Sequence, residues 1–314
     1  MRACDRDGLR KGANGGDRTH ASRHVQAARM PGVATLLRRT LLGALLLAAV
    51  ATVAAASSGK LCFLLWDTLA PRAHGGRRIA VDGVTIYYEA VGSGPPVLVL
   101  HGGLGSLVDM RHQIAALAAR HRVIAPDSRG QGRSTDSAAP LSYALMADDM
   151  LALLDRLAIR RADIVGWSDG GIIGVTLALR HPERVGRLVV IGANYDPGGL
   201  VSLPDPDSPI PPPSLLYRWT APDPAHWPVL CRKIVAMWRT QPRYTPRELG
   251  TIRSPTLVMA GEFDVIRRAH TDALAAAIPG AQEYIVPGAT HRAPLTHPAA
   301  VNARILAFLD GPAR

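Results

Sequence analysis

The sequence predicts an α/β protein built on a mostly parallel sheet. Strand-like and helix-like segments alternate along most of the chain, and several strands are continuous apolar runs such as Val97–Leu100. Such runs are typical of strands buried on both faces, as in a parallel sheet covered by helices. The composition supports a large core, because 47% of the 314 residues are hydrophobic and 19% are charged. A disordered chain would be poorer in apolar residues.

The individual elements follow from local patterns along the chain. Residues 84–89 alternate in polarity, which indicates a strand with one buried face. The later strands are short apolar runs, and amphipathic or apolar helical segments separate them. The predicted strands are residues 84–89, 97–100, 123–125, 163–165, 188–191, 256–259 and 283–286, and the predicted helices are residues 107–120, 143–157, 170–180, 268–278 and 298–309.

The N-terminal part of the chain has a different composition. Residues 1–29 are rich in Arg, Gly and His without apolar periodicity, so we expect them to be disordered. The apolar run Leu41–Ala56 follows Arg38 and Arg39, a pattern typical of an export signal. Residues 40–66 together are long enough for a membrane tether. We therefore expect an exported or membrane-anchored protein whose core lies on the non-cytoplasmic side.

The charge and the cysteines exclude two other classes of protein. The net charge is +11, but residues 1–40 hold nine Arg or Lys and three Asp, a net of +6, so the other 274 residues carry only +5. No basic patch remains that predicts a nucleic-acid partner. The three cysteines are too few and too scattered for a disulfide framework, and no CxxC or HExxH motif predicts a metal site.

The motif with the clearest chemical meaning is Gly166-Trp167-Ser168-Asp169-Gly170, which matches G-x-S-x-G. It stands between a predicted strand and a predicted helix, the context in which this motif forms a sharp turn that exposes the serine as a nucleophile. Glycines flank the turn because it leaves no room for larger side chains. The alternative is that Ser168 only caps the following helix.

A serine nucleophile needs an adjacent base. In a strand–turn–helix site of this kind the partners follow in the order Ser, acid, His, so the base lies late in the chain. His291, in the loop after the last predicted strand, is the best candidate among the 11 histidines. His297 competes with it, but it stands beside Pro298 at the start of the final helix, where a surface position is expected.

The acid should follow the strand that ends at Ala260. The segment Gly261-Glu-Phe-Asp264 offers two carboxylates there. We favour Asp264, three residues past the glycine, over Glu262, and Asp196 after the preceding strand is a more distant alternative. The role of this acid is to hold the imidazole in one tautomer and to stabilise the imidazolium.

An acyl-transfer site also needs hydrogen-bond donors for the developing oxyanion. The backbone N–H of Asp169, at the start of a helix, is one candidate. Gly103 or Leu104, in the turn that begins with His101, is expected to supply the second, because glycines let the backbone approach a ligand. His101 itself is expected to be a structural hydrogen-bonding residue.

The chain is expected to divide into three parts. Residues 1–75 form the leader with the signal or anchor segment, and residues 76–196 and 251–314 form the core. Residues 197–250 contain a proline-rich run, which cannot be helix or inner strand, followed by three tryptophans among polar residues. We interpret this insertion as a small helical cap over Ser168 that determines specificity.

Taken together, the motifs resemble those of the α/β-hydrolase superfamily over roughly residues 76–314. The matching segments, in order, are His101-Gly-Gly, Asp127–Ser134, Gly166–Gly171, Gly261–Asp264 and Gly288–His291. Gly166–Ile172 and Ile191–Asn194 look like the valacyclovir hydrolase (biphenyl hydrolase-like) branch. The resemblance implies an eight-stranded sheet with helices on both faces, a Ser168–Asp264–His291 triad and no cofactor. The leader and the proline-rich cap lie outside the shared motifs.

The function predicted on these grounds is that of a serine hydrolase which cleaves a small carboxylic ester through an acyl-enzyme on Ser168. A carboxylate beside an oxyanion site is costly unless the substrate is cationic, so Asp169 is also a candidate substrate-binding residue for an aminoacyl ester. The alternative is that Asp169 hydrogen-bonds a nearby N–H group or arginine and only shapes the loop. The alternatives are a cofactor-free perhydrolase or C–C hydrolase with the same three residues, and a non-catalytic ligand-binding protein.

Overall fold

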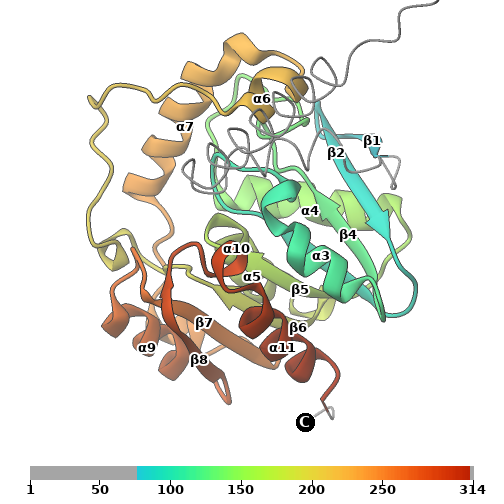
Figure 1. Cartoon of the computed structure of the whole chain (residues 1–314), viewed down its shortest axis with the longest axis vertical. Coiled ribbons are helices and arrows are strands. Elements are labelled where there is room, and N and C mark those ends of the chain that lie inside the picture. Colours follow the sequence, from blue (N-terminus) through green and yellow to red (C-terminus); the bar gives the residue numbers. More distant parts are fainter. Residues whose placement is uncertain (1–75, 312–314) are drawn as a thin grey trace, which may run out of the picture. The chain divides into compact units, whose positions relative to one another are not determined.

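An eight-stranded sheet forms the centre of residues 76–311, the part of the chain that the computed structural model describes (Figure 1). The strands lie in the order β1-β2-β4-β3-β5-β6-β7-β8. β2 pairs antiparallel with both of its neighbours, β1 and β4. All neighbouring strands from β4 to β8 in this order run parallel to one another. The bounds are β1 Arg77–Val81, β2 Val84–Val91, β3 Pro96–Leu100, β4 Arg122–Pro126, β5 Ala162–Trp167, β6 Val185–Ile191, β7 Thr256–Phe263 and β8 Gln282–Thr290. The predicted eight-stranded, mostly parallel sheet is confirmed.

Burial along the strands follows the hydrophobic pattern. In β3 every residue after Pro96 is buried, and β5 and β6 are buried over most of their length, as expected for central parallel strands. β1 lies at the edge of the sheet, and Arg77 and Arg78 leave it largely exposed. This strand begins with these two arginines, and the sequence did not predict it.

The helices pack on the sheet and on one another. α5 contacts β5 and β6, while α4 packs on α5 and α3 packs on α11. The predicted helix 107–120 is divided into a 3-10 turn, η1 (Leu107–Met110), and the shorter α3. The α-helices of the core are α3 Arg111–Leu117, α4 Tyr143–Arg156, α5 Asp169–Arg180, α9 Arg268–Ala277, α10 Ala293–Thr296 and α11 Pro298–Leu309.

The insertion at residues 197–250 is mainly helical from residue 215 onward. It contains α6, α7 and α8, with the 3-10 turns η3 and η4 before and between them, and α6 and α7 lie side by side in Figure 1. The proline-rich segment before α6 has no regular structure. The bounds are η3 Pro197–Gly199, α6 Leu215–Thr220, η4 Pro224–His226, α7 Trp227–Thr240 and α8 Pro246–Leu249.

The parallel strands bring their carboxyl ends to one edge of the sheet, which is where ligands bind in folds of this kind. The predicted site residues follow β3, β5, β7 and β8, and therefore meet at that edge. The predicted disordered leader and export or anchor segment lie outside the described residues and stay predictions. Within residues 76–311, no helix has both the length and the apolar character needed to span a bilayer.

Candidate active site

Ser168 occupies the sharp turn between β5 and α5. Its backbone has φ 54° and ψ −120°, a conformation that a residue other than glycine rarely adopts. The side chain makes no capping hydrogen bond to α5, which argues against the helix-cap interpretation. Its Oγ lies instead 3.1 Å from Nε2 of His291. Backbone strain of this kind persists where the surrounding structure determines it, and it presents the hydroxyl away from the sheet.

The flanking glycines are required by close backbone approaches. A Cβ on Gly166 would lie 2.2 Å from the carbonyl oxygen of Gly170. A Cβ on Gly170 would lie 2.4 Å from the carbonyl oxygen of Leu100, at the end of β3. Both distances are far below van der Waals contact, so larger residues would displace the turn or β3.

The structure brings the three predicted residues into one hydrogen-bonded chain. His291 follows β8, and its Nδ1 lies 2.7 Å from Oδ1 of Asp264, which follows β7. With Nε2 facing Ser168, the imidazole bridges the hydroxyl and the carboxylate. His297, the competing histidine, hydrogen-bonds the neighbouring Thr296 hydroxyl at the exposed start of α11.

Asp264 is held in place by more than the histidine. Its carboxylate accepts backbone N–H groups from Ile266 at 3.0 Å and from Gly261 at 3.2 Å, and the side chain is 3% exposed. Burial acts to raise the pKa of Asp264, but the hydrogen bond and charge of His291 and the two N–H groups outweigh burial and hold the pKa below its ordinary value. The carboxylate is therefore ionised at neutral pH.

The alternative acids serve the backbone elsewhere. Glu262 is exposed and accepts the N–H of Gly288 at 2.7 Å. Asp196 caps η3 through the N–H of Gly198 at 2.8 Å. Neither carboxylate has a hydrogen bond to His291 in the described part of the chain.

Asp169 points its carboxylate into the interior between the core and the insertion. Its Oδ1 accepts the hydroxyl of Tyr143 from α4 at 2.9 Å and the indole N–H of Trp238 from α7 at 2.8 Å. Its Oδ2 is buried and has no hydrogen-bond partner among the described residues. Burial raises the pKa of Asp169, although the two donors oppose the shift.

The turn after β3 approaches the nucleophile closely. A Cβ on Gly102 would lie 3.2 Å from Cβ of Ser168, and a Cβ on Gly103 would lie 2.4 Å from Oδ2 of Asp169. Leu104, with φ 58°, completes this turn. Both candidates for the second oxyanion donor, Gly103 and Leu104, thus belong to the segment that faces the Ser168 turn.

His101 has the structural role expected of it. Its Nε2 accepts the backbone N–H of Ser128 at 2.9 Å, and its Nδ1 lies 2.7 Å from the carbonyl oxygen of Gly102. These bonds connect the turn after β3 to the loop after β4. Both ring nitrogens are therefore occupied by backbone groups.

Four residues that contact the site were not predicted from the sequence: Trp167, Tyr143, Trp238 and Gly192. Trp167 donates its indole N–H to the carbonyl oxygen of His291. Tyr143 and Trp238 hold Asp169, as described above. Gly192, which follows β6 with φ 57°, leaves space where a Cβ would lie 3.0 Å from both Asp264 Oδ2 and His291 Nδ1. The position of Trp167 inside the serine motif was the one signal that could have drawn attention to it.

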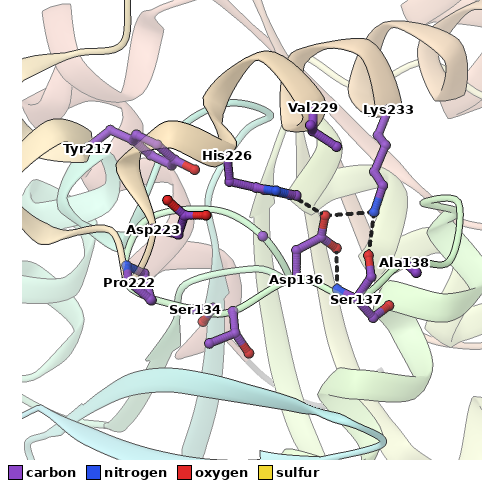
Figure 2. A pocket seen from close by; sticks show the side chains of 12 residues that line it. Ser134, Asp136, Ser137, Ala138, Tyr217, Pro222, Asp223, His226, Val229 and Lys233 are labelled. Carbon is purple, nitrogen blue, oxygen red and sulfur yellow. Dashed lines mark hydrogen bonds and ion pairs between the residues drawn. The ribbon is translucent and has the colours of Figure 1, made fainter.

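A separate cavity of about 390 Å³ lies between the loop after β4 and the insertion (Figure 2). None of Ser168, His291 and Asp264 lines it. Oδ2 of Asp136, from the loop, lies 2.7 Å from both Nε2 of His226 and Nζ of Lys233. Figure 2 marks both contacts with dashed lines. These contacts attach the start of α7 to the core.

The Asp136 contacts predict a pH-dependent stability. Burial acts to raise the pKa of Asp136, but the hydrogen bonds from Lys233 and His226 outweigh it, so the folded-state pKa lies below the unfolded value of about 3.9. The stabilisation is then present above about pH 4 and is lost as the pH falls through the folded-state pKa. We expect Asp136→Asn to lower Tm at neutral pH by about 3–8 °C. Thermal unfolding should show this difference shrinking below about pH 4.

A constant difference in Tm at all pH values would mean that charge is not the cause. The control is Asp223→Asn in the same cavity, because Asp223 accepts a backbone N–H from Ala225 at 3.0 Å and has no cationic partner among the described residues. We expect this variant to change Tm by less than about 2 °C.

Comparison with known proteins identifies the family. A sequence profile for the alpha/beta hydrolase fold matches residues 95–228. A protein of Caulobacter sp. named for carbamate hydrolysis is 33% identical over 281 residues, which cover 74% of this chain and 98% of that relative. This chain belongs to the α/β-hydrolase superfamily. The membership predicted from the motifs is confirmed.

Other relatives of this α/β-hydrolase differ in the reaction for which they are named. The 2-hydroxymuconate semialdehyde hydrolase of a Pseudomonas sp. is 40% identical over 122 residues, which cover 38% of this chain and 43% of that enzyme. A carboxylesterase of Bacillus subtilis is 32% identical over 246 residues, 69% of this chain and 81% of the relative. The crystal structure of an enol-lactonase from Burkholderia xenovorans superimposes with a TM-score of 0.63 at 25% identity, over 75% of this chain and 100% of that one. The chain is thus a hydrolase of the α/β fold.

Proposed function

We propose that this hydrolase cleaves a small carboxylic ester through an acyl-enzyme on Ser168. The observation that carries the proposal is the chain of hydrogen bonds from the Ser168 hydroxyl through His291 to Asp264, with 3.1 and 2.7 Å between the joined atoms. An isolated serine hydroxyl is a weak nucleophile, and an adjacent base oriented by a third group is the arrangement that activates it.

The geometry supports a two-stage reaction. His291 Nε2 accepts the proton of Ser168 Oγ as the oxygen attacks the ester carbonyl, and the imidazolium that forms is stabilised by the ionised Asp264. The imidazolium then gives its proton to the departing alcohol, which leaves an acyl group on Oγ. A water molecule, deprotonated by His291, attacks that acyl group, and the acid is released as Oγ regains a proton.

The oxyanion of each tetrahedral intermediate needs donors near the Ser168 turn. The N–H of Asp169 is one, since Asp169 is the first residue of α5 and that N–H has no partner within the helix. The N–H of Gly103 or Leu104 is the second in this proposal, because their turn lies against Ser168 and Asp169. Removal of a donor of this kind typically costs about 10²–10³ in kcat.

A fluorophosphonate probe tests the proposal directly. An activated serine reacts with it covalently, so we expect one label per chain, located on Ser168 by peptide mapping. Prior incubation with an excess of ester should slow the labelling. Absence of labelling on the folded protein would refute serine activation and would favour the alternative of a non-catalytic ligand-binding protein.

C–C hydrolysis is the second candidate, because a 40% identical segment is shared with a 2-hydroxymuconate semialdehyde hydrolase. Perhydrolysis on the same three residues is a further alternative. A panel that contains short p-nitrophenyl esters, aminoacyl esters, a carbamate and a ring-cleavage dienoic acid separates these activities. We expect kcat/KM to be highest for one of the ester classes. If kcat/KM were highest for the dienoic acid, C–C hydrolysis would replace ester hydrolysis as the proposed activity.

Asp169 supports a finer proposal, that the ester is an aminoacyl ester. Its Oδ2 is buried and has no hydrogen-bond partner within residues 76–311, and burial raises the pKa of Asp169. A protonated amine near the scissile carbonyl would supply the missing counter-charge and would favour the ionised form. Because the residue is 3% exposed and Oδ1 is already bonded, Oδ2 is the atom available for this role.

Asp169→Asn tests the charge and keeps the shape. We expect kcat/KM to fall by about 10- to 100-fold for aminoacyl esters, which lose a charged hydrogen bond, and by less than about 3-fold for neutral acyl esters of equal size. The control is Tyr143→Phe, which removes one donor to Oδ1 and leaves the carboxylate, and which should affect both substrates equally. Equal losses in Asp169→Asn would make Asp169 a structural residue and leave the ester class open.

A further inference from the structure

Trp167, the last residue of β5, connects the nucleophile turn to the loop that carries the base. Its indole Nε1–H donates to the backbone carbonyl oxygen of His291 at 2.8 Å. The two rings lie 5.6 Å apart between centroids and are tilted by 42°. Trp167 is 9% exposed and the hydrogen bond is partly buried, so its loss would remove the protein donor from this carbonyl oxygen.

The sheet fixes His291 relative to Asp264 more directly than relative to Ser168. Thr290 pairs with Phe263 at the end of β7, which places the base beside the acid. A Cβ on Gly261 would lie 2.3 Å from the carbonyl oxygen of Thr290, so this pairing is close-packed. The serine follows β5 and the base follows β8, and both β6 and β7 lie between these strands. Strand pairing therefore connects the serine to the base only through two intermediate strands.

Two hydrogen bonds join the Ser168 turn to His291 directly within the described part of the chain. One runs from Ser168 Oγ to Nε2, and the other from Trp167 Nε1 to the carbonyl oxygen. The first bond ends when Oγ becomes esterified, because the ester oxygen has no proton to donate. The second bond involves no reacting atom and is unaffected by acylation.

We propose that Trp167 is a positioning residue that holds His291 over the acyl-enzyme during deacylation. This inference rests on the proposed acyl-enzyme at Ser168. While the acyl group occupies Oγ, the base must stay where it can deprotonate a water molecule aimed at the acyl carbon. A displacement of about 1 Å at such a position can cost about 10²-fold in rate. Because the Trp167 hydrogen bond is retained in the acyl-enzyme, we expect its loss to slow deacylation more than acylation.

The test is Trp167→Phe, which keeps a ring and removes the N–H. Stopped-flow assays with a p-nitrophenyl ester measure acylation from the first release of nitrophenol, and the decay of the trapped acyl-enzyme measures deacylation. We expect the deacylation rate constant to fall by about 10-fold and the acylation rate constant by less than about 3-fold. Acyl-enzyme should therefore accumulate, and KM should fall together with kcat.

Trp227→Phe is the matched control. Trp227 is also buried, at 6% exposed, and its indole N–H also donates to a backbone carbonyl oxygen, that of Pro211, at 2.7 Å. The two variants lose the same kind of bond, so we expect a similar fall in Tm. Trp227→Phe should leave the ratio of the two rate constants within about 2-fold of the wild-type ratio.

The outcomes separate this inference from the proposed function. If wild-type protein forms no acyl-enzyme and its Ser168 takes no probe, the proposed function fails, and this inference fails with it. The acyl-enzyme could form while Trp167→Phe slows acylation and deacylation equally, or slows neither step. Trp167 then does not position His291 for deacylation, and the proposed function stands. If Trp167→Phe does not fold, position 167 can carry the benzothiophene analogue of tryptophan. This analogue has S in place of N–H and preserves the shape of the ring system. Its acylation and deacylation rate constants then decide the inference in the same way.

Discussion

Ser168→Ala and His291→Ala are each expected to lower kcat by about 10⁴-fold or more. In the proposed reaction the serine supplies the oxygen that becomes acylated, and the histidine accepts and returns its proton. Nε2 of His291 lies 3.1 Å from Oγ of Ser168. Neither side chain is part of the buried apolar core, so both variants should fold. Initial rates at saturating ester, with circular dichroism and Tm as checks of folding, measure the effect.

His297→Ala is the matched control for the histidine. It lies in the same C-terminal region, and its hydrogen bond is to the hydroxyl of the neighbouring Thr296. We expect it to retain at least about half of the wild-type kcat. Near-normal hydrolysis by purified Ser168→Ala or His291→Ala would remove these residues from the reaction.

Asp264→Asn is expected to lower kcat by about 10³- to 10⁴-fold. The ionised carboxylate accepts the Nδ1–H of His291 at 2.7 Å, which leaves Nε2 free to accept the proton of the serine. An amide can present its NH₂ group to Nδ1 instead and stabilise the opposite tautomer. It also provides no negative charge for the imidazolium, so geometry is retained while proton transfer fails.

Glu262→Gln is the control, because Glu262 is the other carboxylate of the same segment and accepts a backbone N–H from Gly288. Its kcat should stay within about 3-fold of the wild-type value. If Glu262→Gln lowered kcat as much as Asp264→Asn, the negative charge of the segment Gly261–Asp264 would be the cause, and not the hydrogen bond to His291.

The central strands and most helices of this fold were predictable because their local patterns agree with their tertiary environments. The run Val97–Leu100 is apolar throughout and forms most of β3. β1 was missed because Arg77 and Arg78 give it the composition of an exposed loop, and its strand character comes from pairing with β2. The helix predicted for residues 107–120 begins as a 3-10 turn, because the loop after β4 binds its start: Asp127 accepts the N–H of Leu107 at 2.7 Å.

The three residues proposed for the reaction were predictable because each follows a recognisable strand. Their supporting contacts were not, because these join distant parts of the chain. Trp238 and Asp169 are 69 residues apart, and Trp167 and His291 are 124 apart. A single sequence records no pairing over such distances. The burial of the Asp169 carboxylate likewise depends on how the insertion packs on the core, because Trp238 of the insertion donates to Oδ1.

The long sequence separation between Ser168 and His291 also bears on when the site is completed during synthesis. Ser168 precedes its base by 123 residues, and the acid precedes the base by 27. Contacts between residues so far apart are slow to form, because a long loop has to close first. During synthesis the strained serine turn can form while β8 and His291 are still unmade. Under the proposed function, an unfinished chain therefore carries a serine without its base, and we expect activity only after β8 has joined the sheet.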